Sequence, residues 1–269
     1  MTGHDVPVTR DPWTSGDRYE PYVGRWTRPV AQEFVGWLAA GPDGRWVDVG
    51  CGTGALSETV LAGGRPASLV GVDPSAGFLR HARTRVADAR AAFSLGSAES
   101  LPLPDGSADA VVSGLVLNFV PDPARAVAEM RRVAAPSGTV AAYVWDYAEG
   151  MQLMRAFWDA AAALDPAAAS LDEGRRFPLC RPEPLARLFA AAGLREVATR
   201  AIDVPTVFRD FDDYWDPFLG GQGPAPAYCV GLAEDARTAL RERLRTSLPV
   251  APDGRIRLTA RAWAVRGTP

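Results

Sequence analysis

Three glycines, Gly50, Gly52 and Gly54, stand at alternate positions directly after the mainly apolar run 46–49. Glycine lacks a Cβ atom, so a backbone turn made of glycines can approach a ligand closely. The run before the turn has the β-branched and aromatic residues of a buried strand, and residues 55–62 after it have helical spacing. The free N–H groups and the positive end of that helix attract electron-rich groups. The arrangement predicts a nucleotide-binding loop.

The spacing of these glycines separates two classes of nucleotide site. In the dinucleotide-binding fingerprint the third glycine follows the second by three residues, whereas Gly54 follows Gly52 by two. Asp73 ends a second apolar segment, 68–73, about 20 residues after the turn, where an acid suits the ribose hydroxyls of either class. An NAD-dependent oxidoreductase is therefore an alternative against which the glycine spacing argues.

The basic residues exclude several mechanisms. The chain has no lysine, so all 29 basic side chains are arginine, and its only histidines are His4 and His81. A phosphate-loop lysine, a lysine Schiff base and a tyrosine–lysine hydride-transfer pair are therefore impossible. His4 falls in a polar tail, and His81 falls in an expected surface helix beside Arg80 and Arg83. Neither histidine is expected to act as a catalytic base.

The composition predicts a globular protein, with 47% hydrophobic residues and a net charge of −3. The cysteines, Cys51, Cys180 and Cys229, are widely spaced and odd in number, which favours a reducing compartment. No apolar run reaches the roughly 18 residues of a membrane helix, and residues 1–10 carry charges where a signal peptide would be apolar. We expect a soluble, cytoplasmic protein. Its charge disfavours nucleic acid as a partner, and the arginines of 237–245 are interpreted as a solvated helix face.

Strand and helix patterns alternate after the glycine turn. The segments expected in order are a strand at 68–73, a helix at 76–86, and strands at 92–95, 108–112 and 139–145. Asp122 followed by Pro123 is a helix-start signal, because the carboxylate caps free N–H groups and proline fits the first helical position. Gly138 is expected to end that helix. Repeated strand–helix units of this length predict a parallel sheet with right-handed crossovers.

The pattern becomes mainly helical beyond residue 146. The segments expected there are helices at 151–165 and 181–192, a strand at 196–208, helical residues over 211–249, and an alternating, antiparallel strand from Ile256. We therefore predict one α/β domain with a Rossmann-like, seven-stranded, mostly parallel sheet, helices on both faces and an antiparallel last strand. Its parts are an N-terminal tail with entrance helices (1–40), a cofactor-binding core (41–150), and the remaining strands with a helical acceptor-binding lid (151–269).

An ordered set of segments resembles the motifs of class I S-adenosylmethionine-dependent methyltransferases, in particular the small-molecule enzymes of the methyltransferase type 11-like group. These segments are 47–54 for the glycine motif, 71–75 for the ribose-binding acidic loop, 96–102 for the loop that borders adenine, 108–117 for the fourth strand and its turn, and 130–138 for the approach to the fifth strand. Ser97 stands where many relatives have aspartate, so a hydroxyl contact replaces an acid–amino hydrogen bond. The strong part of the resemblance covers residues 40–147.

The resemblance implies S-adenosyl-L-methionine as the cofactor and gives each motif residue a role. On the methionine side, this portion of the cofactor would be lined by Gly50, Cys51 and Gly52, its ammonium group would be held by Asp48, and the chain would return at Ser113 and Gly114. On the adenosine side, Asp73 would accept hydrogen bonds from the ribose hydroxyls, Pro74 and Phe78 would pack nearby, and adenine would be bordered by Ser97, Ala98 and Glu99. An entrance segment over the cofactor would include Tyr22 and Arg25. The alternatives are a loop-bracing carboxylate for Asp48, a helix N-cap for Asp73 and a small buried thiol for Cys51.

The sulfonium methyl group is already electrophilic, so the enzyme mainly has to align an acceptor atom with it and exclude water. A general base is needed only where the acceptor begins protonated, so the sequence assigns no catalytic residue. Ligands gather at the carboxyl ends of parallel strands. The candidates near the methyl group are therefore Asn118 and Phe119 after the fourth strand and Asp146 and Tyr147 after the fifth. The entrance helices add Tyr19, Tyr22 and Arg25. Phe119 in the core and Asp146 as a helix cap are the alternatives. The aromatic segment 208–218 is expected either in an acceptor lid or in the packing of that lid on the sheet.

The expected function is methyl transfer to an O, N or C atom of a small molecule, of the quinone or natural-product type, mainly by positioning. No metal is expected, because residues 114–118 lack the carboxylates that a hard cation needs. The missing obvious base leaves a non-catalytic S-adenosylmethionine-binding protein as an alternative. RNA methylation is a weaker alternative that rests only on the arginines of 237–245.

Overall fold

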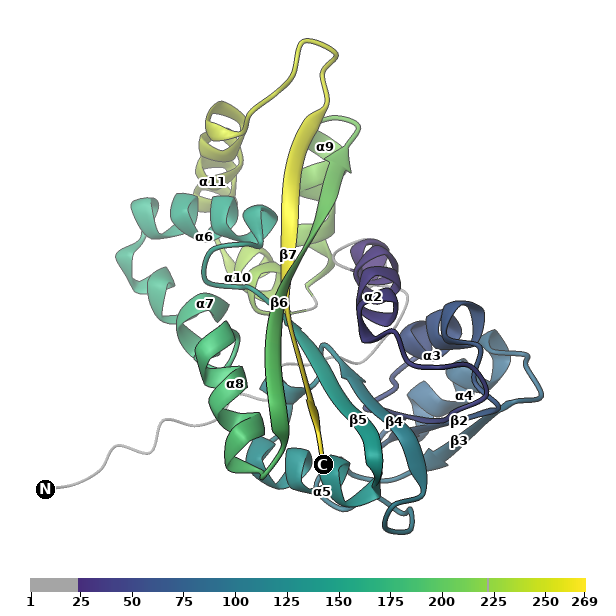
Figure 1. Ribbon diagram of the computed structural model, residues 1–269. Coiled ribbons are helices and arrows are strands. Elements are labelled where there is room, and N and C mark those ends of the chain that lie inside the picture. The colour runs from purple at the N-terminus through teal and green to yellow at the C-terminus, as the bar shows by residue number, and fades with distance from the viewer. Residues whose placement is uncertain (1–23, 222) are drawn as a thin grey trace, which may run out of the picture.

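The computed structural model describes residues 24–221 and 223–269, which build one seven-stranded sheet with helices on both faces (Figure 1). The strands lie in the order β3–β2–β1–β4–β5–β7–β6. Their bounds are Arg45–Val49 (β1), Ser68–Asp73 (β2), Ala91–Leu95 (β3), Ala108–Gly114 (β4), Ala134–Trp145 (β5), Arg195–Phe208 (β6) and Ile256–Thr268 (β7). Strands β1 to β5 pair in parallel, and β7 pairs antiparallel with both β5 and β6. The predicted Rossmann-like sheet is confirmed.

The order of the strands reverses at β1, which has β2 on one side and β4 on the other. Helix α3 (Ala55–Thr59) follows β1 on one face of the sheet, and helix α5 (Pro123–Val133) follows β4 on the opposite face (Figure 1). Connections that leave in opposite directions open a crevice at the carboxyl ends of the strands, where ligands of this sheet type bind. The glycine turn lies at this crevice.

Helices cover the two faces of the sheet in separate groups (Figure 1). Helix α2 (Arg25–Leu38) lies on the same face as α3 and α4 (Ala76–Arg85), and it packs against α3, β6 and β7. Helix α8 (Pro182–Ala191) covers the other face with α5 and packs against α5, β6 and β7. Most side chains of the central strands β4 and β5 are therefore buried.

A helical cap lies beyond the carboxyl ends of the parallel strands (Figure 1). It consists of α6 (Gln152–Leu164), α7 (Glu173–Arg176), α9 (Phe211–Trp215), α10 (Pro224–Gly231) and α11 (Glu234–Ser247). Helix α6 packs against β7, α10 and α11. The stacked rings of Phe157 and Phe218, 4.4 Å apart, and the hydrogen bond from the Tyr214 hydroxyl to the Leu153 carbonyl (3.0 Å) hold it together. Among residues 24–221 and 223–269, no helix is both long and apolar enough to cross a bilayer.

The start of helix α5 is confirmed, and its expected end is wrong. The Asp122 carboxylate accepts a hydrogen bond from the Arg125 N–H (3.0 Å), and Pro123 is the first helical residue. The helix ends at Val133, and Gly138, which was expected to end it, lies inside β5. A Cβ at Gly138 would lie 2.9 Å from the Asp109 carbonyl oxygen. Gly138 therefore permits close approach of β5 to β4 rather than a helix end.

The helix expected at 55–62 is confirmed, but it is irregular and runs on to Gly64. The α-helical part is Ala55–Thr59, and a π-helical turn, Val60–Gly64, continues it. A Cβ at Gly64 would lie 3.3 Å from the Trp46 ring. Gly64 thus lets the end of this segment pack closely against β1.

Candidate functional site

The glycine turn after β1 depends on backbone conformations that favour glycine. Gly50, Gly52 and Gly54 have φ angles of +72°, +53° and +88°. The N–H groups of Gly50 and Cys51 donate to the Val72 carbonyl oxygen at 2.8 and 3.1 Å, which ties the turn to β2. The chain thus passes the crevice with little side-chain bulk.

Asp73 ends β2 beside this turn. Its Oδ2 accepts a hydrogen bond from the Gly52 N–H (2.9 Å), and its Oδ1 accepts one from the Ser75 N–H (2.8 Å). The N-cap of α4 is Ser75, whose Oγ accepts from the Phe78 N–H (3.3 Å), so the N-cap alternative for Asp73 is wrong. Burial raises the pKa of Asp73, and these two backbone hydrogen bonds oppose the rise. Each carboxylate oxygen keeps a lone pair for a ligand.

Asp48 is fully buried at the end of β1. Its Oδ2 accepts a hydrogen bond from the Ser57 hydroxyl (2.7 Å), whereas its Oδ1 has no partner among the described residues. Burial raises the pKa of Asp48 to about 7, the Ser57 hydrogen bond opposes the rise, and the nearby Asp73 adds to it. The carboxylate both braces α3 and keeps one oxygen that lacks a donor, which is the setting for a cationic ligand.

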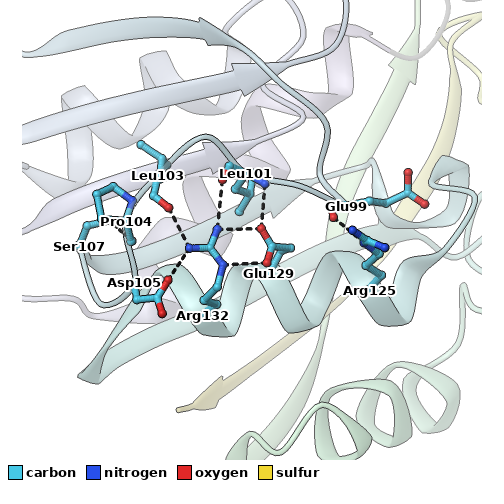
Figure 2. A network of polar contacts seen from close by, with 9 residues as sticks. All are labelled: Glu99, Leu101, Leu103, Pro104, Asp105, Ser107, Arg125, Glu129 and Arg132. Carbon is cyan, nitrogen blue, oxygen red and sulfur yellow. Dashed lines mark hydrogen bonds and ion pairs between the residues drawn. The ribbon is translucent and has the colours of Figure 1, made fainter.

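Figure 2 shows how the loop after β3 is fixed to α5. The Arg132 guanidinium donates to the carbonyl oxygens of Leu101 (3.1 Å) and Leu103 (2.9 Å) and binds both carboxylate oxygens of Glu129 at 2.7 Å. The Glu129 carboxylate accepts from the Leu101 N–H (2.9 Å), and the hydrogen bonds from Arg132 hold the pKa of Glu129 below its usual range. The loop is therefore a braced part of the fold.

The residues predicted to border adenine belong to this loop. The Glu99 carboxylate accepts from the Asp122 N–H (3.0 Å), and its carbonyl accepts from the Arg125 side chain (2.8 Å). The Ser97 hydroxyl accepts from the Glu99 N–H (3.2 Å). These contacts give Glu99 and Ser97 a bracing role at the base of α5.

One cavity of about 260 Å³ lies at the carboxyl ends of β1, β4 and β5. The residues predicted for the cofactor or the acceptor that line it are Asp48, Gly50, Cys51, Gly52, Asp73, Phe78, Gly114, Phe119 and Tyr147. The predicted residues that lie away from its wall are Arg25, Pro74, Ser97, Ala98, Glu99, Ser113, Asn118 and Asp146. Tyr19 and Tyr22 fall outside the described residues. The structure thus brings together the glycine turn, both acids and part of the predicted acceptor side.

Besides Ser97 and Glu99, three more of the residues away from the wall have structural contacts. The Ser113 hydroxyl donates to the Val49 carbonyl (2.8 Å), which links β4 to β1. The Asp146 Oδ1 accepts from the Glu149 N–H (3.0 Å), so this side chain shapes the turn before α6. Arg25 forms an ion pair with Asp213 (3.1 Å) and lies over the ring of Phe208 at 4.7 Å. Arg25 therefore joins α2 to the cap.

The far end of the cavity is aromatic. The rings of Phe119 and Phe177 meet edge to face with centroids 5.2 Å apart, and those of Tyr147 and Phe177 lie 5.5 Å apart. Trp145 and Met154 complete this apolar wall. Flat apolar molecules suit such a lining.

The residues of the cavity wall that the sequence reasoning missed include Phe177, Met154, Thr27, Glu173 and Pro224. They come from four separate segments, because Glu173 begins α7 and Phe177 is its C-cap, and the sequence around Glu173 shows only two acids before two arginines. Within the described part of the chain, no three His, Cys, Asp or Glu side chains converge as a metal site. The buried aromatic residues Phe208, Tyr214, Trp215 and Phe218 do not line the cavity, so the packing alternative for the segment 208–218 describes them.

Comparison with known proteins shows which family the chain resembles. The family model described as "Methyltransferase domain" matches residues 47–142. A demethylmenaquinone methyltransferase of Roseiflexus sp. (strain RS-1) is 35% identical over 181 residues, which are 61% of this chain and 74% of that protein. A 2-methyl-6-phytyl-1,4-hydroquinone methyltransferase of Synechocystis sp. is 29% identical over 247 residues, 83% of this chain and 76% of the relative.

Solved structures with lower identity have the same fold. The YcgJ protein of Bacillus subtilis superimposes with a TM-score of 0.58 at 18% identity, over 89% of this chain and 97% of that chain. A phosphoethanolamine N-methyltransferase 2 of Haemonchus contortus, solved in complex with S-adenosyl-L-methionine, gives a TM-score of 0.55 at 16% identity over 89% of this chain and 52% of its own. The ordered motifs, the sheet and these relatives agree: the chain belongs to the class I S-adenosylmethionine-dependent methyltransferases.

Proposed function

We propose that the protein transfers the methyl group of S-adenosylmethionine to an O, N or C atom of a small molecule held at the aromatic end of the cavity. The observation that carries this proposal is that one cavity joins the glycine turn and the two acids, Asp48 and Asp73, to the aromatic wall around Phe177. The cofactor supplies a methyl group that is electrophilic without further activation. The task of the chain is therefore to bind the two reactants, orient them and exclude water.

The residues of the glycine side fit this cofactor. The unpartnered Oδ1 of Asp48 offers an anionic acceptor to the ammonium group of the methionine portion. The free lone pairs of Asp73 offer acceptors to the two ribose hydroxyls. At Gly50 a Cβ would lie 2.6 Å from the Val116 side chain, so the turn has no room for one. These three features support the cofactor assignment at residue level.

The acceptor class follows from the other end of the cavity. Phe119, Tyr147, Phe177 and Met154 provide an apolar surface that suits an organic molecule of modest size. The relatives from Roseiflexus and Synechocystis are named for demethylmenaquinone and for a phytyl hydroquinone. Both names support an apolar small molecule as the acceptor.

Calorimetry with S-adenosylhomocysteine tests the proposal, with Asp73→Ala and Asp73→Asn as the variants. Loss of hydrogen bonds to a charged group costs about 1.5–3 kcal/mol each, so Asp73→Ala is expected to weaken binding by about tenfold or more. Asp73→Asn keeps one acceptor oxygen and is expected to lose less. Asp159→Asn, at an exposed position of α6, is the matched control. Unchanged affinity in Asp73→Ala, or competition by NAD, would overturn the site assignment.

A further inference from the structure

Glu173 is a buried carboxylate in the wall of the cavity, and the methyl-transfer proposal gives it no role. It begins the short helix α7, is 2% exposed, and lines the cavity together with Phe177 and Tyr147. The Trp158 Nε1–H donates to its Oε2, whereas its Oε1 has no partner among the described residues. A buried carboxylate oxygen without a donor is costly, and it points to a missing ligand group.

Glu173 forms no ion pair with a residue that the structure describes, although Arg176 lies near enough to act on its charge. Burial raises its pKa to about 7. Hydrogen bonds from its own backbone N–H and from Trp158 oppose the rise, the charge of Asp172 adds to it, and that of Arg176 opposes it. Arg155, the arginine of the neighbouring helix α6, is paired with Asp172 at 2.9 Å. Of the described residues that line the cavity, none is basic, and the other two acids, Asp48 and Asp73, belong to its glycine side. With no basic side chain from residues 24–221 and 223–269 in this lining, a group on a bound ligand is a suitable partner for Oε1.

The same wall also contains an unmet donor. Trp145 is 2% exposed and lines the cavity, and its Nε1–H has no acceptor among the described residues. A ligand group that both donates to Glu173 and accepts from Trp145 would satisfy the two atoms. A hydroxyl group does both, whereas an ammonium group is only a donor.

Resting on the proposed methyl transfer, we propose that Glu173 is a catalytic residue that binds the acceptor and takes its proton, and that the acceptor is an aromatic ring with a hydroxyl group. The ring packs among Phe119, Tyr147 and Phe177, and its hydroxyl hydrogen-bonds to Oε1 of Glu173. A hydroxyl oxygen bound in this way keeps lone pairs for attack. A bound ammonium has none, so it would have to lose its proton before it could react.

The proton and electron balance of the step is complete with the groups named. A lone pair of the hydroxyl oxygen forms the new O–C bond to the methyl carbon. The C–S bond breaks, and its electron pair stays on sulfur, which changes from a cationic sulfonium to a neutral thioether. The hydroxyl proton passes to the Glu173 carboxylate, which becomes a neutral acid. With a pKa of about 7, this acid returns the proton to water near neutral pH, so it is ready for the next turnover.

Ligand binding in the complex with S-adenosylhomocysteine tests the proposal without catalysis. The probes are 4-methoxyphenol, 1,4-dimethoxybenzene, which lacks the proton, and 4-methoxybenzylamine, which is a cation, each measured by calorimetry from pH 6 to pH 9. The charge-assisted hydrogen bond is expected to make the wild type bind the phenol about tenfold tighter than the ether at pH 8, and this ratio should fall as the pH drops below 7.

The variant Glu173→Gln removes the negative charge and replaces the unpartnered acceptor oxygen by an NH₂ group, which is a donor. The Trp158 Nε1–H keeps the amide oxygen as its acceptor, so the amide NH₂ takes the position of Oε1 and cannot accept from the phenol. We expect the preference for the phenol to drop below about twofold and to lose its pH dependence. Glu149→Gln, at an exposed position outside the cavity, is the control and should behave as the wild type.

The outcomes separate the two proposals. If Glu173→Gln binds S-adenosylhomocysteine as the wild type does and loses only the preference for the phenol, the role of Glu173 is supported. A preference that survives in Glu173→Gln, tighter binding of the amine than of the phenol, or no binding of any probe to the wild-type complex would overturn it. Failure of S-adenosylhomocysteine to bind the wild type would instead overturn the proposed cofactor site.

Discussion

Replacing Gly50 by alanine tests whether the glycine turn is fixed by its backbone and by the side chain that faces it. Gly50 has a φ of +72°, and a Cβ added there would lie 2.6 Å from both Cγ atoms of Val116. Gly106 is a matched control, because its φ is +62° and nothing lies within 4 Å of the Cβ that alanine would add. The two variants share the backbone strain and differ in the steric overlap.

The magnitudes of the two effects can be separated. A left-handed backbone costs a residue with a Cβ about 1–2 kcal/mol, which applies to Gly106→Ala and Gly50→Ala alike. Overpacking against Val116 adds about 1–3 kcal/mol at Gly50 alone. We therefore expect the free energy of unfolding to fall by about 1–2 kcal/mol in Gly106→Ala and by about 2–5 kcal/mol in Gly50→Ala. At about 2–4 °C per kcal/mol, the Tm values of the two variants should differ by about 2–12 °C.

Urea unfolding of a double-mutant cycle with Val116→Ala isolates the overlap. Removing both Cγ atoms of Val116 should make Gly50→Ala about 1–3 kcal/mol less costly than in the wild-type background. The affinity for S-adenosylhomocysteine, measured by calorimetry, should fall in Gly50→Ala and remain in Gly106→Ala. Equal costs for the two alanine variants, or the absence of coupling between Gly50 and Val116, would refute this account of the turn.

Two further predictions concern buried charge and the braced loop. Because burial raises the pKa of Asp48 from 3.8 to about 7, the ligand-free protein loses stability as the pH rises from about 4 to about 7. Asp48→Asn should make this slope in urea unfolding shallower, and the slope that remains comes from Glu173 and Asp73, whose pKa values burial also raises. An unchanged slope would contradict the assignment. Arg132→Met should lower the free energy of unfolding by about 1–3 kcal/mol and speed hydrogen exchange at the Leu101 N–H. The control Arg131→Met, at an exposed position, should change neither quantity. Equal effects of the two variants would contradict the network in Figure 2.

The features that the sequence predicts correctly are encoded over a few neighbouring residues. The glycine turn follows its strand directly, and Asp73 ends the next strand. The Asp122–Pro123 pair determines the start of α5 through its own cap and fixed φ. The alternation from Ile256 onward predicts a strand with one buried face, because successive side chains of a strand point to opposite faces of the sheet. Local chemistry suffices for each of these.

The features that the sequence reasoning missed depend on contacts between distant segments. Gly138 looked like a helix end, yet the close approach of Asp109 decides its role. Arg25 was assigned to the cofactor, and the structure pairs it with Asp213, 188 residues further along. Glu173 gave no signal, because a four-residue helix has no periodicity and only the fold brings it to the cavity. Pairings of this kind are set by tertiary packing rather than by spacing.

The cavity collects three carboxylates, Asp48, Asp73 and Glu173, and none of the described residues that line it is basic. Burial raises the pKa of each of them, so the charged carboxylates destabilise the ligand-free protein. A cationic ligand offsets that cost, and S-adenosylmethionine is more cationic than its demethylated product by one charge. In the proposed reaction this charge disappears together with one carboxylate, because Glu173 takes the proton as the sulfonium becomes a thioether. The acidic cavity thus favours the reactant over the product of the cofactor, which links the buried acids to product release.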